Sequence, residues 1–154
     1  MKRKRYISVL AVMSVMTALD GCGMQNNFVE EQPKNMTIGI SVYDQYDTFI
    51  SELMSQFQSY VKEKEKDWGI SITLEIQNAE QNQLMQNSQL DSFIEDGVDI
   101  ACINLVDRTD ASSIIEKAKT SDVPVIFFNR ELVKEDLERW DKLYYVGADG
   151  YESG

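Results

Sequence analysis

The spacing of apolar positions changes several times along the chain, and each spacing predicts an element. Residues 37–42 form a short apolar run with β-branched side chains, which is typical of a buried strand. From Asp47 the apolar positions recur every three or four residues, which predicts a helix that Asp47 caps and Gly69 ends. We expect one face of this helix to cover a sheet with Phe49, Ile50, Leu53, Met54, Phe57, Tyr60 and Val61.

The spacing of apolar positions predicts further strands and helices from residue 70 to the end of the chain. Residues 70–76 alternate between apolar and polar, as in a strand with one wetter face, so we place them at a sheet edge. A helix follows at 82–95, with Leu84, Leu90, Phe93 and Ile94 directed inward and Gly97 at its end. Further strands are predicted at 100–105, 125–128 and 143–146, and helices at 111–119 and 135–141.

Alternation of strands and helices predicts an α/β fold, a three-layer Rossmann-like unit with a parallel sheet. Each crossover between parallel strands is right-handed and covers one sheet face, so helices should lie on both faces. Ligands of such sheets bind outside the carboxyl ends of the strands. Candidate chemistry is therefore sought in the loops that follow the strands.

The first 22 residues read as a lipoprotein signal. Lys2 to Arg5 are basic, residues 6–19 are apolar, and Gly21 precedes Cys22. We therefore expect a signal peptide at 1–21, and a tether at 22–36 that holds the protein through lipidated Cys22 to the outer face of the cytoplasmic membrane. Asp20 departs from the usual small or apolar residue, and an uncleaved signal anchor is the alternative.

Charge and composition exclude several classes of function. The whole chain has 15 basic and 26 acidic residues. The signal contains four of the basic residues and one of the acidic residues, so the remaining chain has 11 basic and 25 acidic residues and a net charge of −14. Such a surface repels nucleic acid and anionic lipid, which leaves the anchor as the only membrane contact. The chain has no histidine, and no phosphate-binding or metal-binding motif stands out. We expect no enzyme activity, no cofactor and no metal, and a buried thiol at Cys102.

Polar and aromatic side chains follow three of the predicted strands. Carboxylates and amides each bond two neighbouring hydroxyls, and an aromatic ring covers the apolar face of a pyranose, so a sugar fits this set better than a phosphate. The set comprises Tyr43, Asp44, Tyr46, Asp47, Phe49, Asn104, Asp107, Arg108, Asn129, Arg130 and Glu131.

Each of these residues also has a plainer interpretation. Asp47 is placed to cap a helix, Phe49 is placed as the first core residue of that helix, and Asn129 suits a turn. Asn104 and Asp107 suit loop structuring, because Asn and Asp readily bond nearby backbone at strand ends.

Five segments carry a resemblance to a known family. IGISVYDQYDTFI (38–50), INLVD (103–107), SSIIEKAK (112–119), VPVIFFNRE (123–131) and YYVGADGYESG (144–154) together resemble the amino-terminal lobe of the galactose/glucose-binding proteins. These type I periplasmic binding proteins deliver sugars to ABC importers and, in some bacteria, to chemotaxis receptors. The resemblance covers residues 37–154 and implies the type I periplasmic-binding-protein fold.

The resemblance also implies a set of sugar contacts. By motif, the tyrosine and aspartate after the first strand are Tyr43 and Asp47, the asparagine after the phenylalanine pair is Asn129, and the aromatic that stacks on the pyranose is Phe49. Arg130 stands where the family commonly has lysine. The first hinge strand between the lobes would include Gly147, Ala148 and Asp149.

The resemblance stops at Gly154, so we expect the amino-terminal lobe alone, with the second lobe and its calcium loop missing. The implied partners are glucose or galactose, ABC permease subunits, and a chemotaxis or sensor receptor. Alternatives are a membrane-tethered sensing or interaction module, a truncated product without binding activity, or an enzyme on a flavodoxin-like sheet.

Overall fold

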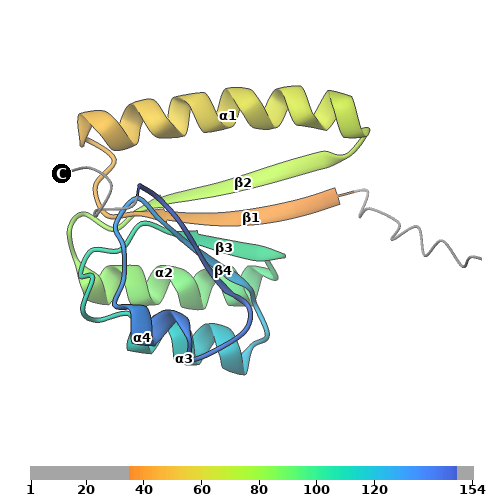
Figure 1. Ribbon diagram of the computed structural model, residues 1–154. Helices are drawn as coiled ribbons and strands as arrows, with labels where there is room; N and C mark the ends of the chain where they lie inside the picture. Colours follow the sequence, from red (N-terminus) through yellow and green to blue (C-terminus); the bar gives the residue numbers. More distant parts are fainter. Residues whose placement is uncertain (1–34, 149–154) are drawn as a thin grey trace, which may run out of the picture. The chain divides into compact units, whose positions relative to one another are not determined.

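The computed structural model describes residues 35–148, in which strands and helices alternate (Figure 1). The predicted signal, Cys22, tether residues 23–34 and Asp149 lie outside the described residues. The predicted tether ends two residues too late, because Asn35 and Met36 already belong to the first strand. The elements in chain order are β1 (Asn35–Val42), α1 (Thr48–Trp68), β2 (Ser71–Asn78), α2 (Gln83–Asp96), β3 (Ile100–Ile103), α3 (Ser112–Thr120), β4 (Val125–Phe128), α4 (Lys134–Leu137) and β5 (Leu143–Val146).

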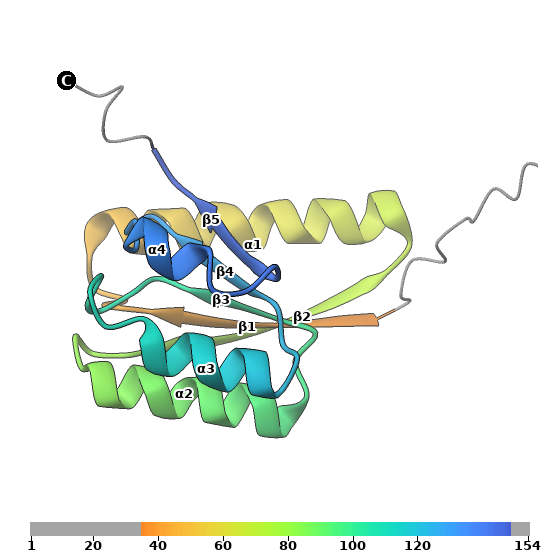
Figure 2. The ribbon, with the colours of Figure 1, turned by 60° about the horizontal axis from the view of Figure 1, so that its bottom comes forward.

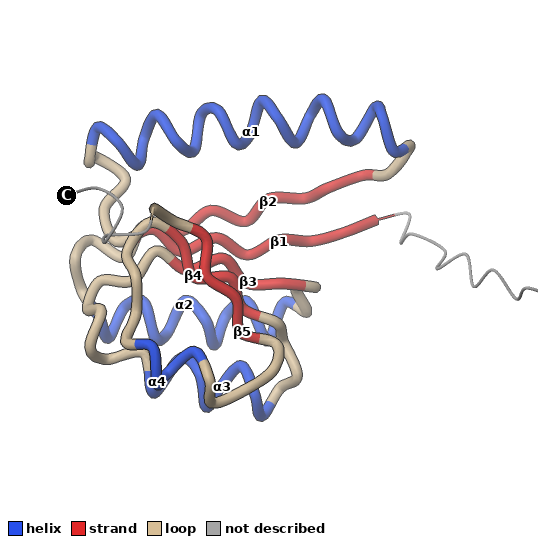
Figure 3. Tube along the Cα trace, in the orientation of Figure 1, coloured by secondary structure: helices blue, strands red, loops and turns tan. Residues whose placement is uncertain are grey.

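All five described strands form one parallel sheet in the order β2-β1-β3-β4-β5. β2 lies at one edge, as its alternating pattern predicted. The chain crosses to one side of β1 to form β2 and to the other side to form β3, so the winding direction reverses between β1 and β3. Ligands of open α/β sheets bind at such a reversal, beyond the carboxyl ends of the strands. Figure 3 shows loops gathered at that end of the sheet.

Helices cover both faces of the sheet, which confirms the predicted three-layer α/β class. α1 lies on one face, and α2 and α3 lie on the other (Figure 2). Asp47 caps α1, because its side chain accepts a hydrogen bond from the Ile50 N–H, and Gly69 ends the helix in the left-handed conformation. Gly97 ends α2 in the same way.

The face beneath α1 is unevenly covered. Ile40, Cys102, Ile126 and Tyr144 lie side by side across β1, β3, β4 and β5. The exposed fraction is 1% at Ile40 and 51% at Tyr144, and Cys102 and Ile126 are half-buried. Cys102 is thus less buried than predicted: it packs against the core but keeps some exposure, because α1 packs over β1 and β2 rather than over the centre of the sheet.

Two helix faces differ from the periodic pattern. On α2, Leu84 is 77% exposed, and Gln86 and Gln89 are buried in its place. On α1, Ile50 and Val61 are buried, whereas Phe49 and Tyr60 are exposed. The inward assignments of Leu84, Phe49 and Tyr60 were therefore wrong. On α2 the reason is visible, because the buried side chains meet polar backbone at the strand ends: Gln86 donates to Asn104 O and Gln89 donates to Asn78 O.

Candidate functional site

The strongest cluster of polar side chains lies at the winding reversal, where the loops after β1, β3 and β4 meet. Tyr43 donates its hydroxyl hydrogen to Asp47 Oδ2 at 2.5 Å. The guanidinium carbon of Arg130 lies 3.7 Å from the centroid of the Tyr43 ring, which is cation–π contact. With Phe49 and Asn129, these residues form what we call the carboxyl-edge site.

Asp47 serves two local partners at once. Its Oδ1 accepts the Ile50 N–H at 2.9 Å, and its Oδ2 accepts the Tyr43 hydroxyl. These two hydrogen bonds hold the pKa of Asp47 below its ordinary value, and the bond from the Tyr43 hydroxyl has the larger effect. Each carboxylate oxygen accepts two hydrogen bonds, so Asp47 retains acceptor capacity for a ligand hydroxyl while it caps α1. The cap interpretation is correct and does not exclude the functional one.

Arg130 joins two loops. Its Nη1 donates to Leu105 O at 3.2 Å and to Val106 O at 2.9 Å, which anchors the guanidinium to the loop after β3. The hydrogen bond to Asp47 is the main cause that raises the pKa of Tyr43, and the positive charge of Arg130 opposes it. Sequence reasoning listed Arg130 among the polar residues that follow the strands but did not name it as a sugar contact, although a cation directly after Asn129 at a strand end was an available signal.

Phe49 lies in the first turn of α1 and is 60% exposed, so its ring is not a core residue. An exposed aromatic ring beside a polar cluster offers apolar area to a partly apolar ligand. The structure places Phe49 at the same end of the sheet as Asp47, two residues away on the same helix turn.

Asn129 follows β4 in the left-handed region, with φ of 63°. Its backbone N–H donates to Val146 O at 3.0 Å, and its carbonyl accepts the Tyr145 hydroxyl at 3.2 Å. The residue is therefore a turn residue, as the plainer interpretation expected. Its side chain is exposed, and no side-chain hydrogen bond is formed within residues 35–148.

Two other polar residues have structural roles, as predicted. Asn104 is fully buried, accepts the Tyr43 N–H at 3.4 Å and donates to Phe128 O at 3.1 Å, so it braces the ends of three strands. Asp107 accepts both the N–H and the hydroxyl of Thr109, and these bonds lower its pKa.

The predicted hinge is only partly described. Gly147 and Ala148 follow β5, and Asp149 is outside the described residues. A Cβ on Gly147 would overlap the hydroxyl end of the Tyr145 side chain, so a larger residue at this position needs that side chain to shift.

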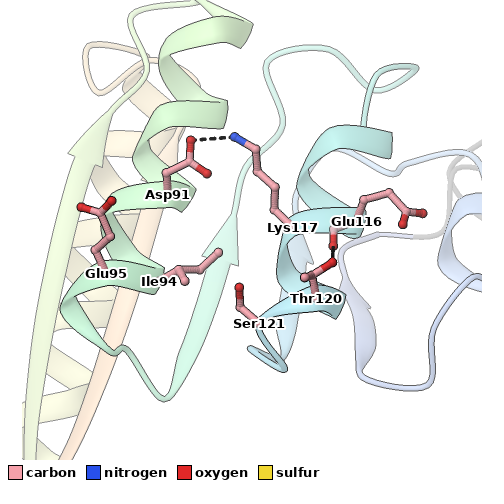
Figure 4. Close-up of a pocket in the computed structure, with 7 residues that line it drawn as sticks. All are labelled: Asp91, Ile94, Glu95, Glu116, Lys117, Thr120 and Ser121. Atoms are coloured by element: carbon pink, nitrogen blue, oxygen red, sulfur yellow. Dashed lines mark hydrogen bonds and ion pairs between the residues drawn. The ribbon is translucent and has the colours of Figure 1, made fainter.

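A groove of about 490 Å³ lies elsewhere, between α2 and α3 (Figure 4). Lys117 and Asp91 form an ion pair of 2.6 Å across it. Its other lining residues include Thr120 and Ser121 at the end of α3, far along the helices from the carboxyl ends of the strands. The groove is therefore separate from the carboxyl-edge site.

Two further observations bear on the chemistry of the described residues. Between residues 35 and 148, no group of three or more acidic, cysteine or histidine side chains is arranged to hold a metal ion. None of the helices in that range is long and apolar enough to cross a membrane.

Comparison with known proteins gives consistent matches. The sequence model described as "Periplasmic binding protein domain" matches residues 38–154. The D-galactose/methyl-galactoside binding periplasmic protein MglB of Haemophilus influenzae is 37% identical over 118 residues, which cover 76% of this chain and 34% of that protein. A xylitol-binding protein of Mycolicibacterium smegmatis is 28% identical over 130 residues, covering 84% of this chain and 35% of that protein.

Among solved structures, a galactofuranose binding protein superposes with a TM-score of 0.57 at 26% identity, over 74% of this chain and 36% of that one. The chain thus spans about a third of the length of its relatives. The matches confirm the predicted type I periplasmic-binding-protein fold.

Proposed function

Because the chain belongs to the periplasmic binding protein domain family, we propose that its carboxyl-edge site binds a monosaccharide for an ABC importer. The observation that carries this proposal is the Tyr43–Asp47–Arg130 cluster at the winding reversal of the sheet, together with the exposed Phe49 two residues after Asp47 in the chain.

The chemistry of the site suits a pyranose. Asp47 would accept hydrogen bonds from ring hydroxyls, Asn129 would donate and accept, and Arg130 would donate from the N–H groups that do not bond Leu105 and Val106. Phe49 would cover the apolar C–H face of the ring. A sugar of the glucose or galactose type is the ligand we propose, and the Haemophilus relative is named for galactose binding.

The cellular setting we propose follows from the signal and the family. Cys22 would carry the lipid anchor at the outer face of the cytoplasmic membrane, permease subunits would be the protein partners, and a chemotaxis or sensor receptor would be a further one. Gly147, Ala148 and Asp149 would belong to the hinge of a two-lobe protein. No catalytic role is proposed for any residue.

The test is a calorimetric titration of the 154-residue chain with D-galactose, D-glucose and myo-inositol. The carboxyl-edge site contacts a ligand from one side only, so we expect dissociation constants in roughly the millimolar range. Asp47→Ala should weaken sugar binding roughly 10- to 150-fold.

Two further variants separate the roles of Asp47. Asp47→Ser retains a capping oxygen for α1 and should still weaken binding, because it removes the carboxylate. Asp110→Ala, which removes an exposed carboxylate from the loop after β3, should bind sugar like the unmodified chain. Unchanged sugar affinity in Asp47→Ser would return Asp47 to the role of a helix cap alone.

A further inference from the structure

Gln86 is a fully buried polar residue in the first turn of α2, and its side chain binds the short segment 104–106. Its Nε2 donates to Asn104 O at 3.0 Å and to Ser41 Oγ at 3.1 Å, and its Oε1 accepts the Val106 N–H at 2.9 Å. The amide therefore fixes both the start and the end of segment 104–106, which follows β3.

The same segment also binds Arg130. Leu105 O and Val106 O accept hydrogen bonds from Arg130 Nη1. The backbone of Val106 is thus held by Gln86 through its N–H and by Arg130 through its carbonyl. Arg130 in turn lies over the Tyr43 ring. A continuous path of contacts leads from the interior of the lobe to the carboxyl-edge site.

We propose that Gln86 is a positioning residue of the carboxyl-edge site: by holding segment 104–106 it sets the place of Arg130 over Tyr43. Its relevance to ligand binding rests on the proposed function. Without the Gln86 amide, the Asn104 carbonyl and the Val106 N–H lose their partner, so the segment rearranges to satisfy them elsewhere. The carbonyls that anchor Arg130 move with it.

α2 supplies a matched control at the next turn. Gln89 is also buried, accepts the Ser41 hydroxyl at 2.6 Å and donates to Asn78 O at 2.7 Å. It forms no hydrogen bond to segment 104–106 within the described part of the chain. Gln86 and Gln89 share Ser41 Oγ as a partner. Replacing Gln89 therefore perturbs the same helix, the same kind of buried amide and this shared partner, but leaves the direct bonds between Gln86 and segment 104–106 in place.

The experiment compares Gln86→Met with Gln89→Met by two-dimensional NMR of arginine Nε–Hε groups in the purified chain. Stacking on an aromatic ring shifts the Arg130 signals upfield, and Arg130→Lys and Tyr43→Leu identify the signal and its unstacked position. We expect Gln86→Met to move the Arg130 signal toward its position in Tyr43→Leu, and Gln89→Met to leave it in place. An unmoved signal in Gln86→Met, or equal movement in both variants, would overturn the proposal.

If Gln86→Met does not fold, Gln86→Glu takes its place, since it keeps an acceptor for the Val106 N–H and loses the donor to Asn104 O. Movement of the Arg130 signal in that variant supports the proposal, and full retention contradicts it.

A galactose titration followed by the same spectra gives the second readout. Gln86→Met should bind about five- to tenfold more weakly than Gln89→Met at equal temperature below both unfolding transitions. Equal affinities of the two variants would refute a positioning role in binding. If the unmodified chain binds no sugar, the proposed function fails, and the Arg130 signal still decides whether Gln86 positions Arg130.

Discussion

The contact between Gly39 and Phe93 shows that α2 packs closely on the sheet, and we predict that adding a side chain at Gly39 destabilises the fold. Gly39 lies in β1, and a Cβ added there would meet three ring atoms of Phe93 at 2.6 to 2.8 Å. Phe93 is fully buried in the core between the sheet and α2. Because its ring has no free space, Gly39→Ala must displace the ring or the helix.

The expected cost follows from overpacking. Inserting a methyl group into a well-packed core destabilises a protein by about 1–3 kcal/mol. For a domain of this size, each kcal/mol lowers the melting temperature by about 3–5 °C. Gly39→Ala should therefore melt about 3–15 °C below the unmodified chain, measured by circular dichroism and by urea titration.

A double-mutant cycle with Phe93→Leu tests the cause. The smaller side chain leaves room for the new methyl group, so the two substitutions together should cost less than the sum of the single effects by at least about 1 kcal/mol. Gly69→Ala is the control, because a Cβ at Gly69 meets nothing within 4 Å and the substitution destabilises only through the positive φ of 66°. The free-energy cost of Gly69→Ala should therefore add to that of Phe93→Leu. Additive effects for Gly39→Ala and Phe93→Leu, within about 0.5 kcal/mol, would refute the close packing.

Four further predictions concern single side chains. The Tyr43 hydroxyl lowers the pKa of Asp47, so ionised Asp47 stabilises the folded state above the ordinary carboxyl pKa of 3.8, and this stabilisation is lost as the pH falls through the lower pKa of the folded state. The difference in unfolding free energy between the unmodified chain and Asp47→Asn should therefore shrink on acidification, and a difference that grows would contradict this. Phe49→Ala should weaken sugar binding in calorimetry with almost no change in melting temperature, because the ring is 60% exposed; an unchanged sugar affinity would remove it from the site. Cells fed labelled palmitate should label the chain through Cys22, and label that persists in Cys22→Ser would disprove that attachment. Burial raises the pKa of the Cys102 thiol to about 11, so little thiolate is present at pH 7. In a Cys22→Ser chain, Cys102 should react with a thiol reagent at pH 7 about a hundredfold more slowly than free cysteine does. Rapid reaction in the folded chain would show that the thiol is more accessible than the structure indicates.

Much of the fold was predictable because its signals are local. The apolar run of β1 and the alternation of β2 each depend on neighbouring residues alone. Capping by Asp47 and the stop at Gly69 are also local, since a cap bonds backbone within one turn. The predicted bounds of β4 and β5 agree with the structure for the same reason.

Some element ends were not predictable in this way. β3 ends at Ile103 rather than at Leu105, because Asn104 turns inward to bond Tyr43 and Phe128. Those partners are far away in the sequence, and no local pattern reveals them.

The sequence by itself determined the order of strands and helices, the parallel α/β class and the residues that follow each strand, because these depend on local periodicity and on general rules of chain winding. Only the tertiary structure decided which of those residues meet. Gln86 is buried because segment 104–106 offers it backbone partners, and Arg130 stacks on Tyr43 because the same segment anchors it. From the helical pattern of apolar residues alone, a glutamine is predicted to lie at the surface. At the ends of packed strands, however, buried backbone groups need hydrogen-bond partners, and a buried glutamine side chain supplies them.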